Sequence, residues 1–384
     1  MAAATLQRAT HMTTSTHSTE APESQAPEQE WSVPSTTPSS AFRDKGATAT
    51  ATRRDQADEH EHVTSLRSFY HPHTQLGECP LYRAEDKTLH FIDVLGQRIH
   101  ILDLSSGDPT SYSMRTIECP ERITFIAFSA LRSPEGTSTQ RYYVVCYFQG
   151  LATVDEADGS WTVLQKIIPD EEKHLVRLND GAIDSRGRLW FGTIDMPGAD
   201  RFREQPTSIV SSRASGSLFC YTIDGLLDVH ESGGFFCSNG IGWSPNDQTM
   251  FFTDSATKTI WAYDFDAERA KISNKRIFIK RTDVGEPDGL LVDSLGNVYT
   301  FLWEGSKVEK YDPAGRYMTH WEVNAWRVTH GAWVGEHLDE MILTSAVAWD
   351  GLPKWHDEEA GALFWLKNLG VKGMAKHKFG RPAS

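Results

Sequence analysis

Four side chains that carry a carboxylate or amide oxygen stand at one recurring position of this 384-residue chain. Each lies five residues before a short polar turn, and the four are Glu78, Asn179, Asn239 and Asp288. Carboxylate and amide oxygens are the ligands that hard divalent cations such as Ca²⁺ and Mg²⁺ prefer in proteins. Brought together by the fold, the four residues would line one pocket with oxygen ligands.

The same position recurs twice more, at Thr124, five residues before Ser129, and at His330, five residues before Gly335. The six positions are separated by 46, 55, 60, 49 and 42 residues. A period near 50, built from strand-like segments, is typical of β-propellers, in which each repeat forms one blade. Equivalent positions of all blades face one central axis, so residues far apart in sequence are expected to meet there.

Short apolar segments around the recurring position predict the strands that must hold it. Predicted strands at 88–93 and 98–103 flank a tight turn, and the same unit recurs at 249–254 with 259–264 and at 297–301 with 307–312. Each repeat therefore predicts a four-stranded antiparallel meander that buries its faces only when neighbours stack. The sequence predicts an all-β, six-bladed β-propeller over residues 64–384, without a convincing helix. A strand at 361–366 is expected to pair with 66–70 and close the ring.

Three segments depart from the repeat. Residues 1–63 consist mainly of Ala, Thr, Ser, Pro, Glu and Gln, a composition that predicts a disordered tail because it offers too little apolar surface to offset chain entropy. Residues 196–215 form a polar, strand-poor insertion, which predicts either a functional lid or a disordered loop. Residues 351–360 form a second insertion of this kind.

Charge and cysteine content restrict the partners. With 38 Lys and Arg against 52 Asp and Glu, the net charge of −14 disfavours nucleic acid and anionic membranes. No apolar run approaches the roughly 20 residues needed to span a bilayer, and the N-terminus lacks a secretory signal core. The five cysteines form no C-x-x-C pair, which favours free thiols in a reducing compartment. We therefore expect a cytoplasmic protein that acts on a small molecule, and the sequence leaves its oligomeric state open.

Short motifs at the recurring position also carry a family resemblance. They are Leu76-Gly77-Glu78-Cys79-Pro80, Arg177-Leu178-Asn179-Asp180-Gly181, Ser238-Asn239-Gly240 and Pro287-Asp288-Gly289, joined near the C-terminus by Gly361-Ala362-Leu363-Phe364 and Leu369-Gly370-Val371-Lys372-Gly373. In order and spacing the set resembles the senescence marker protein-30, gluconolactonase and luciferin-regenerating enzyme family, which includes regucalcin. The resemblance covers roughly residues 76–379 and implies a six-bladed β-propeller.

The resemblance further implies that Glu78, Asn239 and Asp288 bind one divalent cation at the mouth of the central channel. It implies that Arg177 and Asn179 contact the substrate. Ca²⁺ is the first expectation, Mg²⁺ and Mn²⁺ suit the same oxygen donors, and some relatives use Zn²⁺. Asp180, next to the recurring position, is expected to support the ligands from a second layer.

A plainer interpretation exists for these motifs, because Asn-Asp-Gly, Ser-Asn-Gly and Pro-Asp-Gly are common turn sequences. Any one of them alone favours a turn. Their shared register, together with Glu78, favours a site.

His330 departs from the family pattern, which usually has a small hydroxyl residue there in a Thr-Ser pair. Here the pair is Thr329-His330. An imidazole at this position could bind metal, contact the substrate, or act as an acid or base near neutral pH. The alternative is a channel-lining histidine that only hydrogen-bonds water.

The first functional hypothesis is a metal-dependent lactonase, a carboxylic ester hydrolase of the gluconolactonase kind. The ion would polarise the lactone carbonyl and acidify a water, with Asp288 as general base and Arg177 and Asn179 holding the substrate. The 196–215 insertion would shield the site. No Gly-x-Ser-x-Gly motif points to a serine hydrolase.

Two alternatives remain open. A non-hydrolytic pathway enzyme, catalysing a cyclisation, dehydration or isomerisation, is suggested by His330 and by Trp303-Glu304 where the family tends to carry glycine. A calcium-binding regulator without turnover is the third hypothesis. Arg177 and Asn179 argue against it, because a cation buffer has no use for substrate-binding residues.

Overall fold

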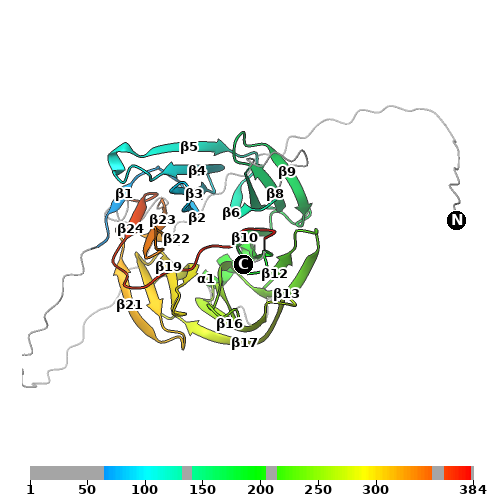
Figure 1. The fold of residues 1–384 in the computed structure, drawn as a ribbon. Coiled ribbons are helices and arrows are strands. Elements are labelled where there is room, and N and C mark those ends of the chain that lie inside the picture. Colours follow the sequence, from blue (N-terminus) through cyan, green and yellow to red (C-terminus); the bar gives the residue numbers. More distant parts are fainter. Residues whose placement is uncertain (1–64, 132–140, 205–213, 348–358, 382–384) are drawn as a thin grey trace, which may run out of the picture. The chain divides into compact units, whose positions relative to one another are not determined.

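The computed structural model describes residues 65–131, 141–204, 214–347 and 359–381. In these ranges six four-stranded antiparallel sheets stand around one axis (Figure 1), which confirms the predicted six-bladed β-propeller. The predicted tail, residues 1–63, lies outside the described residues. So do residues 205–213 and 351–358, which belong to the two predicted insertions.

Each of the first five blades follows chain order from the axis outward. The first blade contains β2 (Gly77–Arg83), β3 (Thr88–Asp93), β4 (Arg98–Asp103) and β5 (Ser113–Glu118). The second contains β6 (Ile123–Ser129), β7 (Tyr142–Tyr147), β8 (Gly150–Asp155) and β9 (Trp161–Lys166). The third contains β10 (Val176–Ile183), β11 (Leu189–Asp195), β12 (Gly216–Tyr221) and β13 (Leu227–Phe235). The next two contain β14 (Ser238–Trp243), β15 (Thr249–Asp254), β16 (Thr259–Asp266) and β17 (Lys271–Lys280); and β18 (Glu286–Val292), β19 (Val298–Trp303), β20 (Lys307–Tyr311) and β21 (Tyr317–Glu322). A 3₁₀ turn, η1 (Pro109–Ser111), precedes β5.

The sixth blade closes the ring with strands from both ends of the described chain. Its order from the axis is β22 (Arg327–Val334), β23 (Glu340–Ala346), β24 (Leu363–Leu366) and β1 (Ser68–Tyr70). Ser68 pairs with Phe364 and Tyr70 with Leu363, as the sequence predicts. This closure leaves no open gap between the first blade and the last, so the inner strands surround the axis completely.

Burial falls from the axis to the rim. All seven residues of β11 are buried, and so are all eight of β22, because blades stack on both faces of these strands. The outer strand β17 leaves most of its residues exposed. This gradient explains why the inner segments consist of β-branched, aromatic and small residues, whereas the rim strands carry charge.

A β-bulge interrupts the same point of every inner strand. The pairing register shifts between Glu78 and Leu81 in β2, and equivalent shifts occur in β6, β10, β14, β18 and β22. A bulge turns the side chains at that point away from the regular alternation. The recurring position lies within this bulge in five blades and directly before it in β2, where Glu78 still pairs with Ile92.

One helix corrects the prediction that no helix is present. Residues Met196–Glu204 of the first insertion form α1 directly after β11. The side chain of Asp195 caps it, since its Oδ1 accepts a hydrogen bond of 2.8 Å from the Gly198 amide, and Pro197 occupies the first turn. No helix within the described ranges is long and apolar enough to cross a bilayer.

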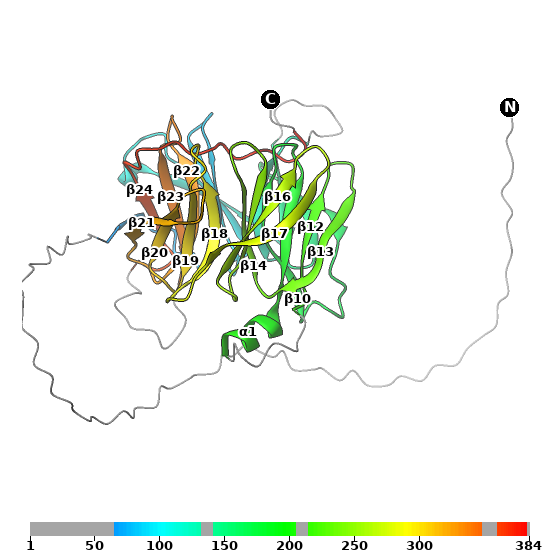
Figure 2. The same ribbon diagram turned by 90° about the horizontal axis from the view of Figure 1, so that it is seen from below.

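The two ends of the ring are covered differently. Figure 2 shows α1 at one end, below the start of β10. At the other end, where turns follow the inner strands, the C-terminal segment 371–381 binds those turns through its backbone. Ala130 donates to the Phe379 carbonyl, Gly380 donates to the Gly187 carbonyl and Ser294 donates to the Lys372 carbonyl, each at 2.8 Å. A substrate is therefore expected to approach from the α1 end.

Candidate functional site

Six residues at the recurring position lie on the innermost strands of the six blades, each at the bulge. We call them the ligand ring: Glu78, Thr124, Asn179, Asn239, Asp288 and His330. The inner strands contact one another around the axis, from β2 through β6, β10, β14 and β18 to β22 and back to β2. Val176, at the start of β10, pairs with Asp195, which caps α1. The ring therefore lies toward the α1 end.

A chain of hydrogen bonds joins three adjacent blades at this ring. Arg177 Nη1 donates to Asn179 Oδ1 at 2.7 Å, and Asn179 Nδ2 donates to Asn239 Oδ1 at 3.0 Å. On its other side, Asn239 Nδ2 donates to Ser255 Oγ at 2.8 Å, and this hydroxyl donates to the Pro287 carbonyl at 2.6 Å. The predicted substrate residues and one predicted metal ligand thus form a single network.

Ser255 decides how the Asn239 amide is oriented. Because the Ser255 hydroxyl donates its proton to Pro287, it must accept from the Asn239 amide nitrogen, which leaves the Asn239 oxygen on the side of Asn179. The Asn239 oxygen thus points away from Ser255 and accepts from Asn179. The sequence analysis did not identify Ser255; its only sequence signal is a polar residue directly after β15.

Three carboxylates lie close together at the ring; Asp180 and Asp288 are buried, and Glu78 is half-buried. Burial raises the pKa of Glu78 to about 8, with Asp180 as the next cause. Burial, followed by Glu78 and Asp180, raises the pKa of Asp288 well above its usual range. Burial also raises the pKa of Asp180 to about 6, and its Oδ2 atom has no hydrogen-bond partner among the described residues. These groups are poorly compensated by the protein, which is the condition that a bound cation would relieve.

The donor set fits a hard divalent ion. Glu78 and Asp288 provide carboxylate oxygens, and Asn239 provides an oriented amide oxygen. Within the described ranges no three His, Cys, Asp or Glu side chains form a complete metal-binding group by themselves. The expected set contains only two such side chains, and its third donor is an amide.

His330 lies in the ring, but it is packed rather than open. Only 2% of its surface is exposed, and its ring stacks on Phe301 with centroids 5.7 Å apart. Its Nδ1 lies 2.7 Å from the Gly331 amide nitrogen and 2.9 Å from the Gly331 carbonyl oxygen, and its Nε2 lies 3.7 Å from the unpartnered Asp180 Oδ2. Burial, followed by Lys376, lowers the pKa of His330 well below its usual range. A neutral imidazole therefore faces Asp180.

Gly289 leaves the room that this imidazole occupies. A β-carbon at Gly289 would lie 2.5 Å from His330 Cγ and Cδ2, and 2.8 Å from the Thr329 carbonyl oxygen. We expect Gly289→Ala to lower the free energy of unfolding by about 1–3 kcal/mol through overpacking. In a His330→Ser background, where the imidazole is absent, Gly289→Ala should lower the free energy of unfolding much less. Urea denaturation of the four proteins measures this difference. Equal costs in both backgrounds would show that the imidazole does not occupy this space.

Arg203 connects α1 to the rim of the site. Its Nε and Nη2 donate to both oxygens of Glu286, at 2.9 and 2.8 Å, and Glu286 precedes Asp288 by two residues. The same guanidinium lies 3.8 Å from Cys237 Sγ, two residues before Asn239. The described part of the predicted insertion therefore reaches the side of the ring where Asn239 and Asp288 lie.

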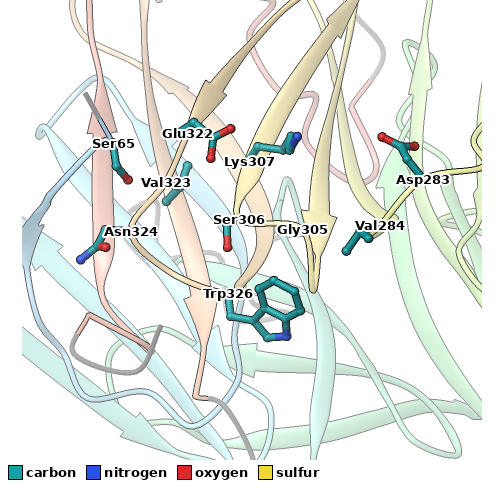
Figure 3. A pocket seen from close by; sticks show the side chains of 10 residues that line it. All are labelled: Ser65, Asp283, Val284, Gly305, Ser306, Lys307, Glu322, Val323, Asn324 and Trp326. Carbon is teal, nitrogen blue, oxygen red and sulfur yellow. The ribbon is translucent and has the colours of Figure 1, made fainter. Parts of the chain in front are cut away.

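A cavity of about 570 Å³ lies elsewhere, between loops of the fifth and sixth blades (Figure 3). Ser65, Asp283, Lys307, Glu322, Asn324 and Trp326 are among the residues that line it. None of the ligand ring residues lines this cavity. We therefore place the candidate site at the ring, on the evidence of its hydrogen bonds and carboxylates.

Comparisons with known proteins agree with the fold. A family model described as "SMP-30/Gluconolactonase/LRE-like region" matches residues 76–347. The chain is 30% identical to regucalcin of Xenopus laevis, over 79% of this chain and 95% of that protein. It is 29% identical to a pentonolactonase of Haloferax volcanii, over 76% of this chain and 90% of the other.

Among solved structures, a luciferin-regenerating enzyme superposes with a TM-score of 0.66 at 26% identity. The match covers 80% of this chain and 95% of that chain. The alignments therefore extend over nearly the whole length of these proteins, so the ring lies within the shared region.

Proposed function

The chain belongs to the SMP-30/gluconolactonase/LRE-like family, and from that premise we propose that it hydrolyses the ring ester of a small-molecule lactone with the help of a divalent cation. The observation that carries the proposal is the group of buried and half-buried carboxylates at the ligand ring, beside an amide oxygen whose orientation Ser255 fixes. The pentonolactonase relative supports lactone chemistry for this scaffold.

The ring residues divide the work of hydrolysis. Glu78, Asn239 and Asp288 would hold the cation, and Ca²⁺, Mg²⁺, Mn²⁺ or Zn²⁺ suits this set. When bound, the cation supplies Lewis-acid polarisation of the ester carbonyl and makes water more acidic. Asp288 takes the proton of the attacking water. The new C–O bond forms at the carbonyl carbon, the ring C–O bond breaks, and the ring oxygen leaves as a hydroxyl, giving a hydroxy acid.

Substrate positioning falls to the neighbouring blade. Arg177 and Asn179 hydrogen-bond each other at 2.7 Å, which fixes both without using the remaining guanidinium nitrogens of Arg177. Those nitrogens are donors for hydroxyl or carbonyl oxygens of the substrate. Beside this contact, Asp180 Oδ2 and His330 Nε2 face each other at 3.7 Å.

The pairing of His330 with Asp180 also favours a second candidate, a non-hydrolytic cyclisation, dehydration or isomerisation in the same pocket. The two groups are 3.7 Å apart, and a closer approach in a substrate complex would let them transfer a proton. A regulator that binds calcium without turnover has weaker support, because the Arg177–Asn179 contact has no role in it.

One assay separates the three functions. We expect a panel of small lactones, followed in a pH-stat, to show acid release that a chelator abolishes and that added Ca²⁺, Mg²⁺, Mn²⁺ or Zn²⁺ restores. Chelator-insensitive conversion without acid release would instead support the non-hydrolytic enzyme. Tight Ca²⁺ binding without turnover of any lactone would support the regulator.

A further inference from the structure

Two arginines occupy equivalent positions on adjacent blades, just outside the ligand ring. Arg122 directly precedes β6 and lies two residues before Thr124. Arg177 lies in β10, two residues before Asn179. Because the repeat places equivalent residues at equal depth, the two side chains lie at one level, nearer the α1 end than the ring itself.

Phe148 stands between the two arginines and fixes both. The guanidinium carbon of Arg177 lies 4.8 Å from the centroid of the Phe148 ring, and that of Arg122 lies 5.8 Å from it. The Phe148 amide donates to the Arg122 carbonyl at 3.2 Å, and the Leu178 amide donates to the Phe148 carbonyl at 2.9 Å. One aromatic ring and its backbone therefore hold two positive charges together.

Neither arginine forms an ion pair with any carboxylate of the described ranges, although the protein is acidic. Arg177 Nη1 donates to two neutral acceptors, Asn179 Oδ1 and the Leu178 carbonyl. Arg188 and Arg203, by contrast, each have a carboxylate partner, Asp184 and Glu286. Burial lowers the pKa of Arg177 to about 10; Cys237 and Glu78 oppose this shift, whereas Arg122 and Arg203 add to it. Arg177 is half-buried and Arg122 is exposed, so the two guanidinium groups form a positive site at one aromatic ring that an anion can reach and bind.

We propose that Arg122 and Arg177 bind a carboxylate of the substrate, so that the lactone is one that keeps a free acid group beside its ring ester. The inference rests on the proposed function and names the substrate class of that site. In a monolactone of an aldaric acid the free carboxylate lies at the end of the carbon chain away from the ester carbonyl, so the ligand ring can hold the ester while the arginine pair binds the carboxylate. A singly charged carboxylate suits this site better than a phosphate dianion, because Glu78, Asp180 and Asp288 lie nearby.

The test compares two lactones that differ only in this group. One is a neutral aldonolactone, and the other is the monolactone of the corresponding aldaric acid, with a carboxylate in place of the terminal hydroxymethyl. We expect the wild-type protein to favour the acidic lactone in kcat/KM by about tenfold or more, and rising ionic strength should reduce the preference. Arg122→Gln should lower the acidic-to-neutral ratio of kcat/KM about tenfold.

Two further variants act as controls. Arg122→Lys keeps the charge and should retain part of the preference even if Arg122→Gln folds poorly. Arg269→Gln removes the same charge from an exposed turn, where Arg269 pairs with Asp266, and should leave the ratio unchanged. An unchanged ratio in Arg122→Gln, or a wild-type preference for the neutral lactone, would overturn the proposal. So would a preference for a phosphorylated lactone over the carboxylate.

Binding separates this inference from the proposed hydrolysis. Calorimetric titration with the open-chain dicarboxylate, which needs no turnover, should show about tenfold weaker binding to Arg122→Gln than to wild type. If neither lactone is opened but this difference is found, the lactonase assignment fails and the anion site stands. If both lactones are opened and the dicarboxylate binds both proteins equally, the arginine pair has no such role.

Discussion

Replacing Asp288 with asparagine is expected to lower kcat for lactone hydrolysis by about 10²–10⁴-fold, the range found when a general base is removed. The substitution keeps the shape of the side chain but removes the negative charge and the proton acceptor. Asp288 is buried, and Glu78 and Asp180 raise its pKa, so its charge opposes folding when no cation is bound. The cation-free variant should therefore melt at the same temperature as wild type or higher.

Two comparisons make this result specific. Asn239→Ala removes a neutral ligand and should mainly weaken cation binding, so that a higher cation concentration restores the turnover of the variant. Asp266→Asn changes an exposed turn carboxylate in the same way as Asp288→Asn and should leave turnover intact. Full activity in Asp288→Asn at a saturating cation concentration would contradict the proposed role of Asp288 in the site.

Chelation at pH 8 is expected to lower the free energy of unfolding by about 3 kcal/mol, relative to protein with the cation at a hundred times its Kd. The reason is that the cation binds only the folded protein. At the same cation concentration, chelation should lower the free energy of unfolding less at pH 6, because protons occupy the same carboxylates and weaken cation binding. Denaturant titrations with and without chelator at the two pH values measure the loss of stability at each pH.

The cation-free protein should also become less stable as the pH rises from 7 to 8. Glu78 keeps its proton up to a pKa of about 8 when folded, whereas its ordinary value is 4.5, so the folded state binds more protons in this interval. Stability then falls by about 1–2 kcal/mol per pH unit, counting Glu78 and Asp288. Histidines whose pKa is lowered, such as His330, are neutral in both states here and do not interfere.

Glu78→Gln provides the control, because glutamine does not titrate and should flatten this slope. A cation-free stability that stays constant or rises between pH 7 and 8 would contradict the burial of these carboxylates.

The repeat in the sequence determined the architecture and the depth of the ring. A turn five residues after each recurring position sets the register of each inner strand, and a one-residue slip would move every side chain to the other face. The sequence therefore placed Glu78, Asn239 and Asp288 on three inner strands facing one axis, and the pairing of β1 with β24 followed from the apolar segments at the two ends. It missed α1, although Asp195 and Pro197 are a helix-start signal, because the insertion has too few apolar residues to show a helical period.

Tertiary structure alone decided how the side chains at the ring act on one another. Ser255 orients Asn239, Asp180 meets His330, and Phe148 joins Arg122 to Arg177 across two blades. In each of these contacts the two residues that touch lie 16 to 150 residues apart in sequence and at different repeat positions. A periodic pattern fixes where a backbone runs, whereas a hydrogen bond or ring contact depends on side-chain directions in neighbouring blades, which only packing sets.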